Sequence, residues 1–386
     1  MAVFLDEYSM LRARELYYAH RILQLAFGNE LPFGGIAFCL MGDPGQNPPV
    51  AGVPLWKIAC TRADHPDDTL GKILYYSLFK KGIELVKVKR VLDDPTAAEF
   101  LTILDGIRNG DCTEEEWQIV LHACSKDTMG DAAFQERFGD EFDCTYIFNT
   151  NAKVLQHNMK MIQRVGEPIA LIEARHTGDS KKMGSDAFMN LDCSLFLCVG
   201  AKVVMTQNVC QPAGLCNGAT GVVMDIVYND GEGPPSLPRF VMVDFGEKYT
   251  GTPFFPGDDN RRGWVPVHPR TATDFTFKSG ERQEHTRTML PLRLAWAWTP
   301  WKTQGQKLKG KVVCELGDKE QDAGITYTAF SRVTKMANFG IIGGLTYERF
   351  TSKIRDHSKF AGRIREEKRL RELSAKTIEQ LLSTVE

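Results

Sequence analysis

The sequence lacks the features that define several classes of protein. No apolar run is long enough to cross a membrane, and the N-terminus does not have the plan of a secretory signal peptide. The ten cysteines include no C-x-x-C pair, and no histidine lies beside them at zinc spacing. We therefore expect an intracellular protein, nuclear or mitochondrial if eukaryotic, with reduced, mostly buried thiols, no zinc site and no membrane contact.

The chain also lacks a strong overall charge. Its formal net charge is −2 over 386 residues, so a nucleic-acid site would have to be a local patch of basic residues. The hydrophobic fraction of 43% and the charged fraction of 25% are ordinary for a globular protein, and the length allows two or three domains.

The periodicity of the apolar residues predicts an α/β fold. Several short runs are apolar throughout, which is typical of parallel strands covered on both faces. Longer segments with apolar residues at helical spacing lie between them, and Gly82 and Gly110 are placed to end two of these helices. Strands are predicted over 1–5, 36–42, 83–91 and 167–174, and helices over 12–27, 69–82 and 96–110.

The pattern changes after about residue 195. Strand-like segments separated by Gly, Asn and Pro predict a small antiparallel barrel or sheet inserted into the α/β body. Residues 229–285 are rich in Gly, Pro and charge and predict long surface loops. The tail from Arg349 carries interleaved acids and bases, which favours a solvated helix over a DNA-binding one.

An acid pair follows the first predicted strand. In open parallel sheets, ligands bind at the carboxyl ends of the strands. Asp6 at that position suits Mg²⁺, and Glu7 suits the water that attacks a γ-phosphate. The pattern is weak by itself, because a strand that runs into a helix also favours acids in the first helical turn.

Other residues strengthen the nucleotide interpretation. Asp43 and Gln46 lie on a loop that Gly and Pro stiffen, and a glutamine near a γ-phosphate can sense its presence. Arg90 and Arg332 each follow an apolar element, and an arginine side chain suits the charge of a transferred phosphoryl group. Taken singly, each arginine is better explained as an ordinary surface or ion-paired residue.

Seven segments, in order, resemble motifs of the PIF/RecD-type superfamily-one DNA helicases. The resemblance runs from residue 1 to about residue 345, and its most specific parts are the fifth motif, the sixth motif and the stretch GLCNGATGVV. One departure is Trp301, where the family usually has histidine. The segments are FLDEYSML, PFGGIAFCLMGDPGQNPPV, IELVKVKRV, IFNTNAKVLQHN, LCVGAKVVMTQNVCQPAGLCNGATGVV, AWTPWKTQG and TYTAFSRV.

The resemblance implies an ATP-dependent helicase that moves 5′ to 3′ along single-stranded DNA, with ATP and Mg²⁺ in a cleft between two RecA-like domains. It makes Asp6 the Mg²⁺ ligand, Glu7 the residue that activates water and Gln46 the γ-phosphate sensor. Arg90 and Arg332 would reach the phosphates from the second domain. Further residues implied at the ATP site are Asp43 and Gly305, and those implied along the DNA are Thr299, Trp301, Lys302, Thr303 and Gln304.

The same resemblance implies a domain plan. The fold would be α/β, with an incomplete first RecA-like domain and a complete second one that carries an inserted small β-barrel. A charged helical tail would follow. The boundaries are 1–81 for the first domain, 82–204 with 286–348 for the second, 205–285 for the insert and 349–386 for the tail.

A phosphate loop is missing. A RecA-like nucleotide site needs G-x-x-x-x-G-K-[ST] between a strand and a helix, upstream of the acid pair, and only five residues precede Asp6. The segment GQKLKGKV at 305–312 fits until Val312, which has no hydroxyl, and it leads into a predicted strand rather than a helix. We therefore expect a fragment, a truncated product or a misplaced start, and little ATP hydrolysis by this chain alone.

Two other functions stay open on the sequence. The chain could bind single-stranded DNA without hydrolysing ATP, or it could dock on a complementing chain or on a missing N-terminal segment. Aromatic and basic residues near the predicted DNA track suit stacking and phosphate contact, although core packing is the preferred explanation for Trp296 and Trp298 and is slightly preferred for Trp301. The basic ones are Lys302, Lys307 and Lys309.

Overall fold

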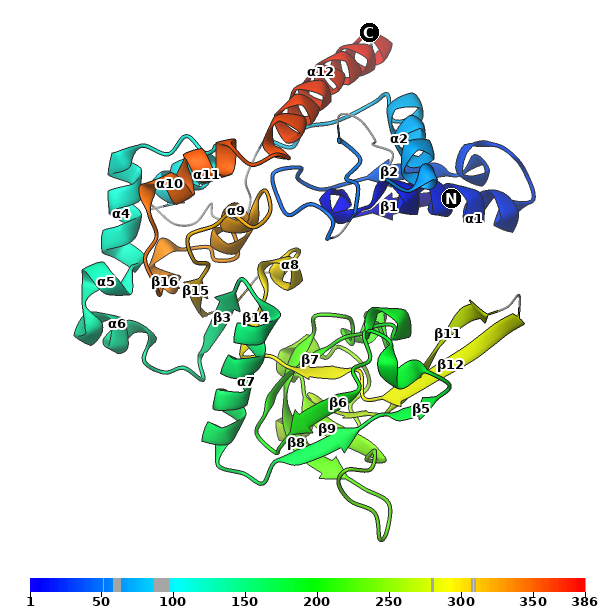
Figure 1. The fold of residues 1–386 in the computed structure, drawn as a ribbon, viewed down its shortest axis with the longest axis vertical. Coiled ribbons are helices and arrows are strands. Elements are labelled where there is room, and N and C mark those ends of the chain that lie inside the picture. The colour runs from blue at the N-terminus through cyan, green and yellow to red at the C-terminus, as the bar shows by residue number, and fades with distance from the viewer. Residues whose placement is uncertain are drawn as a thin grey trace. The chain divides into compact units, whose positions relative to one another are not determined.

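A computed structural model describes residues 1–50, 52–57, 64–86, 97–278, 281–306, 308 and 310–385. The chain forms two compact units (Figure 1). The first contains Met1–Asn149 and Thr299–Glu386, and the second is Thr150–Trp298. The domain boundaries predicted above divide the chain at other residues and stay a prediction.

The N-terminal part of the first unit is built on two parallel strands. β1 (Ala2–Leu5) pairs with β2 (Ala37–Leu40) in the register Ala2↔Ala37 to Leu5↔Leu40, which confirms both predicted strands. Helices α1 (Ala13–Phe27) and α2 (Pro66–Leu78) pack together beside them. The strands are not covered on both faces as predicted, because exposed side chains alternate along each and Phe4 is 66% exposed.

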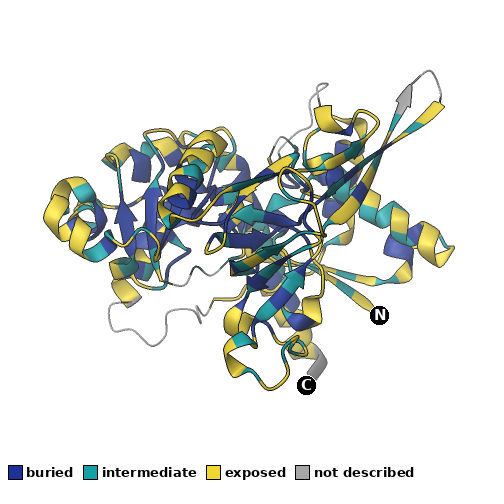
Figure 2. Ribbon diagram, turned by 90° about the horizontal axis from the view of Figure 1, so that it is seen from below, coloured by how far each residue is buried: buried dark blue, intermediate teal, exposed yellow. Residues whose placement is uncertain are grey.

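The rest of the first unit surrounds a second parallel sheet. Strands β3, β15 and β16 are parallel neighbours in that order, and their side chains share a buried core with the helices around them (Figure 2). The strands are β3 (Cys144–Phe148), β15 (Lys311–Glu315) and β16 (Phe339–Ile341). The helices are α3 (Ala97–Asn109), α4 (Glu114–Cys124), α5 (Lys126–Met129), α6 (Asp131–Phe138), α8 (Pro300–Thr303), α9 (Ile325–Phe330), α10 (Tyr347–Phe350), α11 (Ser352–Arg355) and α12 (Phe360–Val385).

Two predictions for this unit need comment. The helix predicted over 96–110 is confirmed as α3, and it ends where Gly110 adopts a φ of 69° that suits glycine. The prediction of a strand over 83–91 is wrong for residues 83–86, because residues 81–86 have no regular secondary structure. The remainder of that segment, with Arg90, lies outside the described residues.

The second unit is mostly antiparallel sheet around one apolar core. Its described strands form a five-stranded sheet in the order β10-β9-β8-β7-β13, a three-stranded sheet β11-β12-β5, and the pair β4-β6. The elements are α7 (Asn151–Val165), β4 (Ala170–Glu173), β5 (Arg175–Thr177), β6 (Ser194–Leu197), β7 (Lys202–Met205), β8 (Thr220–Val227), β9 (Phe240–Asp244), β10 (Trp264–Val267), β11 (Arg270–Lys278), β12 (Glu281–Met289), β13 (Leu292–Leu294) and β14 (Ala297–Trp298).

The antiparallel pairing predicted for this region is confirmed. The closure of the sheet into a barrel stays a prediction. The long surface loops predicted over 229–285 are wrong where β9 to β12 form strands, whereas residues 229–239 and 245–263 contain no strand or α-helix. Thr271 and Thr273 of β11, and Thr286 and Thr288 of β12, each lie two positions apart, and this strand-forming pattern outweighs the charge of the segment.

The helix predicted for the tail is confirmed as α12, but the prediction that it is solvated is wrong. One face of α12 is buried: Arg363, Glu366 and Glu367 are 2%, 1% and 6% exposed. The charges are tolerated there because each finds a partner, such as the Tyr75 hydroxyl, which donates to Glu366 Oε1 at 2.5 Å. Among the described helices, none has the length and apolar character needed to cross a bilayer.

Candidate functional site

The acid pair lies where β1 ends, as predicted. Asp6 is exposed, and its Oδ1 accepts the Glu7 amide hydrogen at 2.8 Å. Glu7 has a φ of 57° and a ψ of 40°, in the left-handed region that a residue other than glycine seldom adopts. The Tyr8 amide donates to the Met41 carbonyl, beyond the end of β2, at 2.9 Å. A strained turn at the carboxyl ends of two parallel strands is a common place for function.

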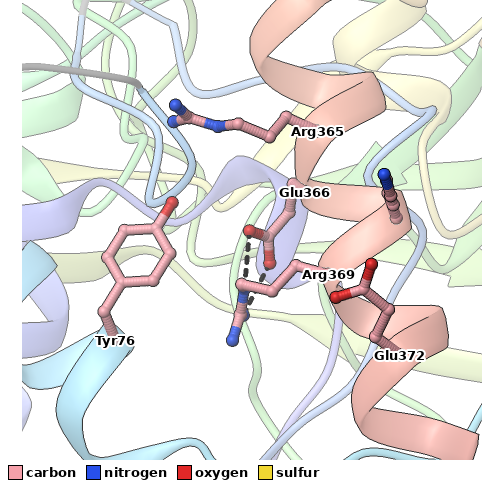
Figure 3. Close-up of a pocket in the computed structure, with 6 residues that line it drawn as sticks. Tyr76, Arg365, Glu366, Arg369 and Glu372 are labelled. Atoms are coloured by element: carbon pink, nitrogen blue, oxygen red, sulfur yellow. Dashed lines mark hydrogen bonds and ion pairs between the residues drawn. The ribbon is translucent and has the colours of Figure 1, made fainter.

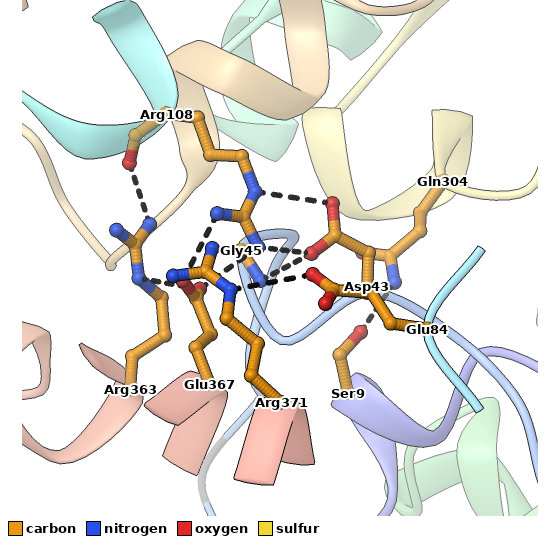
Figure 4. Close-up of polar contacts among 9 residues, drawn as sticks. All are labelled: Ser9, Asp43, Gly45, Glu84, Arg108, Gln304, Arg363, Glu367 and Arg371. Carbon is orange, nitrogen blue, oxygen red and sulfur yellow. Dashed lines mark hydrogen bonds and ion pairs between the residues drawn. The ribbon is translucent and has the colours of Figure 1, made fainter. Parts of the chain in front are cut away.

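Gln304 joins the segment of the acid pair to the loop that carries Asn47, and Figure 4 shows its hydrogen bond to Ser9. Its amide nitrogen Nε2 donates to Glu7 Oε2 at 2.8 Å and to the Ser9 hydroxyl at 2.8 Å. Its Oε1 accepts the Asn47 backbone N–H at 3.1 Å. Gln304 is only 8% exposed, so these hydrogen bonds are shielded from water. Three segments that are far apart in the sequence thus meet at one side chain.

Gly305 makes this approach possible. Its φ is 74°, and a Cβ atom placed there would lie 3.2 Å from Glu7 Oε1. A side chain would therefore be strained and would crowd the Glu7 carboxylate. The structure places Gly305 beside Glu7, which is itself assigned to the nucleotide site. A contact between Gly305 and the nucleotide stays a prediction.

The loop with Gln46 contains buried polar atoms that need partners. The side-chain Oε1 of Gln46 is buried, and so are Nδ2 and Oδ1 of Asn47, and within the described part of the chain none of the three has a hydrogen-bond partner. Each such atom costs free energy unless water or a polar ligand pairs with it. Gly324 packs on this loop, since a Cβ atom there would lie 2.5 Å from the Gly45 carbonyl oxygen.

Asp43 belongs to a charge cluster that sequence reasoning missed. Arg108, from the end of α3, contacts Asp43 Oδ1 at 2.7 Å and Glu367 Oε1 of α12 at 2.8 Å through Nη2. Burial acts to raise the pKa of Asp43, but the charge and hydrogen bonds of Arg108 outweigh it and the pKa is lowered. Arg363 adds a hydrogen bond to the Arg108 carbonyl at 2.6 Å. No local pattern near residue 108 signals this contact, which depends on three separate elements.

Arg332 is buried and bound to protein acceptors. It is 2% exposed; its Nε donates to the Thr328 carbonyl at 2.8 Å, and its Nη1 donates to the Thr303 carbonyl at 3.1 Å. Nη2 donates to the Ser331 hydroxyl at 2.6 Å. The guanidinium thus holds the turn after α8, next to the segment that carries Gln304. To contact a phosphate, the Arg332 guanidinium would have to replace some of these hydrogen bonds with bonds to the phosphate oxygens.

The remaining predicted DNA contacts lie on or beside α8. Thr299 and Thr303 are buried, and the Thr303 hydroxyl donates to the Pro300 carbonyl at 2.8 Å. Lys302 is exposed, whereas Trp301 is partly buried against the core around β15, so the packing explanation for it is confirmed. Trp296 and Trp298 of the second unit are 1% and 6% exposed, so the packing explanation is confirmed for them as well. Lys307 and Lys309 lie outside the described residues.

The segment 305–312 is not a phosphate loop. Lys311 begins strand β15, and Val312 is a fully buried member of it. A phosphate cradle needs the N-terminus of a helix at this point. The expectation that this segment leads into a strand is therefore confirmed.

The acid pair suits an Mg²⁺ ion that is held partly by the protein and partly by the phosphates of a nucleotide. In the described residues, no three His, Cys, Asp or Glu side chains gather as a metal-binding group. One exposed carboxylate, that of Asp6, is enough where the phosphates of a nucleotide and water supply the other oxygens. The chemistry of this donor suits Mg²⁺ held together with a nucleotide.

A mixed α/β fold with acids at the carboxyl ends of parallel strands is consistent with the RecA-like class. No family model matches the chain. The chain is 26% identical over 341 residues to the zebrafish (Danio rerio) "ATP-dependent DNA helicase PIF1", covering 88% of this chain and 46% of that protein. It is 26% identical over 343 residues to the human (Homo sapiens) one, covering 88% and 45%. It spans about half the length of these relatives.

The solved structures agree with these relatives on the fold. The Pif1 helicase from Candida albicans superposes with a TM-score of 0.67 at 20% identity, over 95% of this chain and 76% of that one. The Bacteroides Pif1 helicase in complex with ADP-AlF3 and single-stranded DNA gives 0.63 at 22% identity, over 90% and 72%. The homologues of this chain are therefore PIF1 ATP-dependent DNA helicases, and the predicted resemblance is confirmed.

Proposed function

We propose that this chain acts as part of an ATP-dependent DNA helicase that moves 5′ to 3′ along single-stranded DNA. The observation that carries the proposal is the position of Gln304. This residue of the predicted DNA motif holds Glu7 of the acid pair and the backbone of the loop that carries Gln46. A change in the DNA motif would thereby act directly on the residues assigned to the nucleotide.

The roles follow from the chemistry of each group. Asp6 is proposed to hold Mg²⁺, which would offset the charge of the ATP phosphates. Glu7 is proposed to orient the attacking water, and Gln46, whose buried Oε1 needs a hydrogen-bond donor, to respond to the γ-phosphate. Arg90 and Arg332 are the proposed phosphate arginines. Asp43 is proposed to act through the shape of the Gln46 loop, because Arg108 occupies its carboxylate.

The DNA contacts are proposed to come from the exposed side of α8. Lys302 is exposed there and suits a phosphate group. Thr299 and Thr303 are buried and would position the turn instead of binding DNA through their side chains. The predicted division into two RecA-like domains and a β-rich insert is part of the same proposal.

The chain by itself is proposed to hydrolyse ATP poorly. Its sequence contains no G-x-x-x-x-G-K-[ST], and such a loop supplies the backbone amides and the lysine that hold the β- and γ-phosphates.

The test has two parts. The purified chain is assayed for ATP hydrolysis with and without oligo-dT, and the DNA upstream of the Met1 codon is read for an in-frame phosphate loop. We expect almost no DNA-stimulated hydrolysis by the chain alone, and restored hydrolysis when the upstream segment is included. Rapid hydrolysis by the chain alone would contradict the proposed inactivity. If no phosphate loop is encoded upstream, the helicase proposal fails.

A further inference from the structure

The folded tail helix separates its positive from its negative charges. In the sequence, acids and bases alternate along α12, but two of the acids, Glu366 and Glu367, are 1% and 6% exposed in the structure. Their partners are internal: Glu367 binds Arg108, and Glu366 accepts hydrogen bonds from Tyr75 and Arg369. Folding thereby removes two negative charges and one positive charge, that of Arg363, from the surface of the helix.

A basic stripe remains on the outer face. Four cations and one acid of α12 recur at helical spacing, so they lie on one side of the helix. Three of the cations are exposed, and the fourth is half-buried and paired with Glu366. The stripe spans twelve residues, from 365 to 376, or roughly 16 Å of helix, which is several times the axial spacing of phosphates in one DNA strand. We define the α12 stripe as Arg365, Lys368, Arg369, Glu372 and Lys376.

A pocket beside the stripe adds an aromatic ring (Figure 3). It measures about 400 Å³ and is lined by Tyr76 of α2, by the cations Arg365, Lys368 and Arg369, and by the acids Glu366 and Glu372. Tyr76 is partly buried, and the Arg369 guanidinium lies 5.1 Å from the centre of its ring. An aromatic ring next to cations suits an unstacked base followed by its phosphate.

We propose that the α12 stripe and Tyr76 form a second binding site for single-stranded nucleic acid. The cations would contact phosphates and the ring would stack on one base. This site is separate from the contacts proposed on α8, and binding to it needs no nucleotide hydrolysis. The choice of single-stranded nucleic acid as its ligand rests on the proposed function. A duplex would bind less well, because its bases are already stacked within the helix.

The charge part of the proposal is tested by a triple variant, Arg365→Gln, Lys368→Gln and Lys376→Gln. Binding of fluorescent oligo-dT is measured by anisotropy over a series of salt concentrations. Loss of three phosphate contacts should reduce the slope of log K against log salt by about 2. The matched control replaces three exposed lysines elsewhere in the first unit. It is Lys319→Gln, Lys335→Gln and Lys353→Gln, and its slope should not change.

The aromatic part is tested by two single variants. Tyr76→Phe keeps the ring and should bind like the original chain. Tyr76→Leu keeps the bulk but loses the flat face, and should bind oligo-dT about 5-fold or more weakly. Equal binding by both variants would overturn the stacking role.

Other outcomes separate this proposal from the helicase proposal. If Lys302→Gln weakens binding and the triple variant binds like its control, the contacts on α8 stand and the second site is refuted. If only the triple variant weakens binding, the second site stands and the α8 contacts fail. Stripe-dependent binding to phosphatidylserine vesicles without binding to oligo-dT would overturn the choice of nucleic acid as the ligand.

Discussion

Arg108 provides the sharpest test of how the tail helix supports the candidate site. Its side chain is 15% exposed and forms ion pairs with Asp43 and Glu367, which are 26% and 7% exposed. Replacing it with alanine would leave the Asp43 carboxylate without an arginine, and Glu367 would keep only its ion pair with Arg363, at 3.3 Å. For fully buried pairs this loss costs about 3–5 kcal/mol, and the partial exposure of Asp43 lowers our expectation to roughly 2–4 kcal/mol.

The assay is urea unfolding of Arg108→Ala followed by tryptophan fluorescence, with Arg371→Ala as the matched control. Arg371 lies on α12 and pairs with Glu84, but the two side chains are 61% and 46% exposed. Its loss should lower the free energy of unfolding by about 1 kcal/mol or less. Equal effects of the two variants would refute the reasoning.

Two further measurements examine the same contact. The Gly45 amide donates to Asp43 Oδ1 at 2.8 Å, so its hydrogen exchange should become faster in Arg108→Ala. The pKa of Asp43 is lowered in the folded chain, so the stability it contributes is present above its unfolded pKa of about 3.9 and is lost as pH falls through the folded value. The difference between Arg108→Ala and the original chain should therefore shrink below about pH 4.

Three other predictions follow from local geometry. Gly324→Ala would place a Cβ atom 2.5 Å from a backbone oxygen and should cost more than about 2 kcal/mol in urea unfolding, whereas Gly130→Ala, with nothing within 4 Å, should cost only about 1 kcal/mol for its positive φ. Gln304→Ala should lower the free energy of unfolding by about 1–3 kcal/mol, because it leaves buried partners without hydrogen bonds; no change would contradict its role as a link. Burial raises the pKa of Cys124 to about 12, so iodoacetamide at pH 8 should modify the exposed Cys39 and leave Cys124 unmodified, as mass spectrometry would show.

Much of the first unit was predictable because its signals are local. The apolar run before Asp6 predicts a strand, and the helical spacing over 12–27 predicts α1, since both patterns depend only on neighbouring residues. The motif around Gln304 could likewise be recognised, because its residue types and their order carry the resemblance. The role of Gln304 as a link could not, because its partners are about 300 positions away in the chain.

The wrong predictions arose where charge was taken as a sign of solvent. The threonine-rich strands β11 and β12 were expected to be loops, and α12 was expected to be solvated all round. In both segments, charged residues occur together with a regular pattern: β11 and β12 pair as strands, and α12 packs one of its faces. Sequence composition alone does not show which charges will find partners.

The sequence by itself determined the α/β class, the acid pair after the first strand, the absence of a phosphate-loop motif and the resemblance to PIF-type helicases. Those features are carried by residue types and their order along the chain. Only the tertiary structure decided which residues meet. It joined Glu7 to Gln304, tied Asp43 to the tail through Arg108, and buried Glu366 while leaving Lys368 exposed. The physical reason is that burial and pairing of charges depend on contacts between distant segments, which no local pattern specifies.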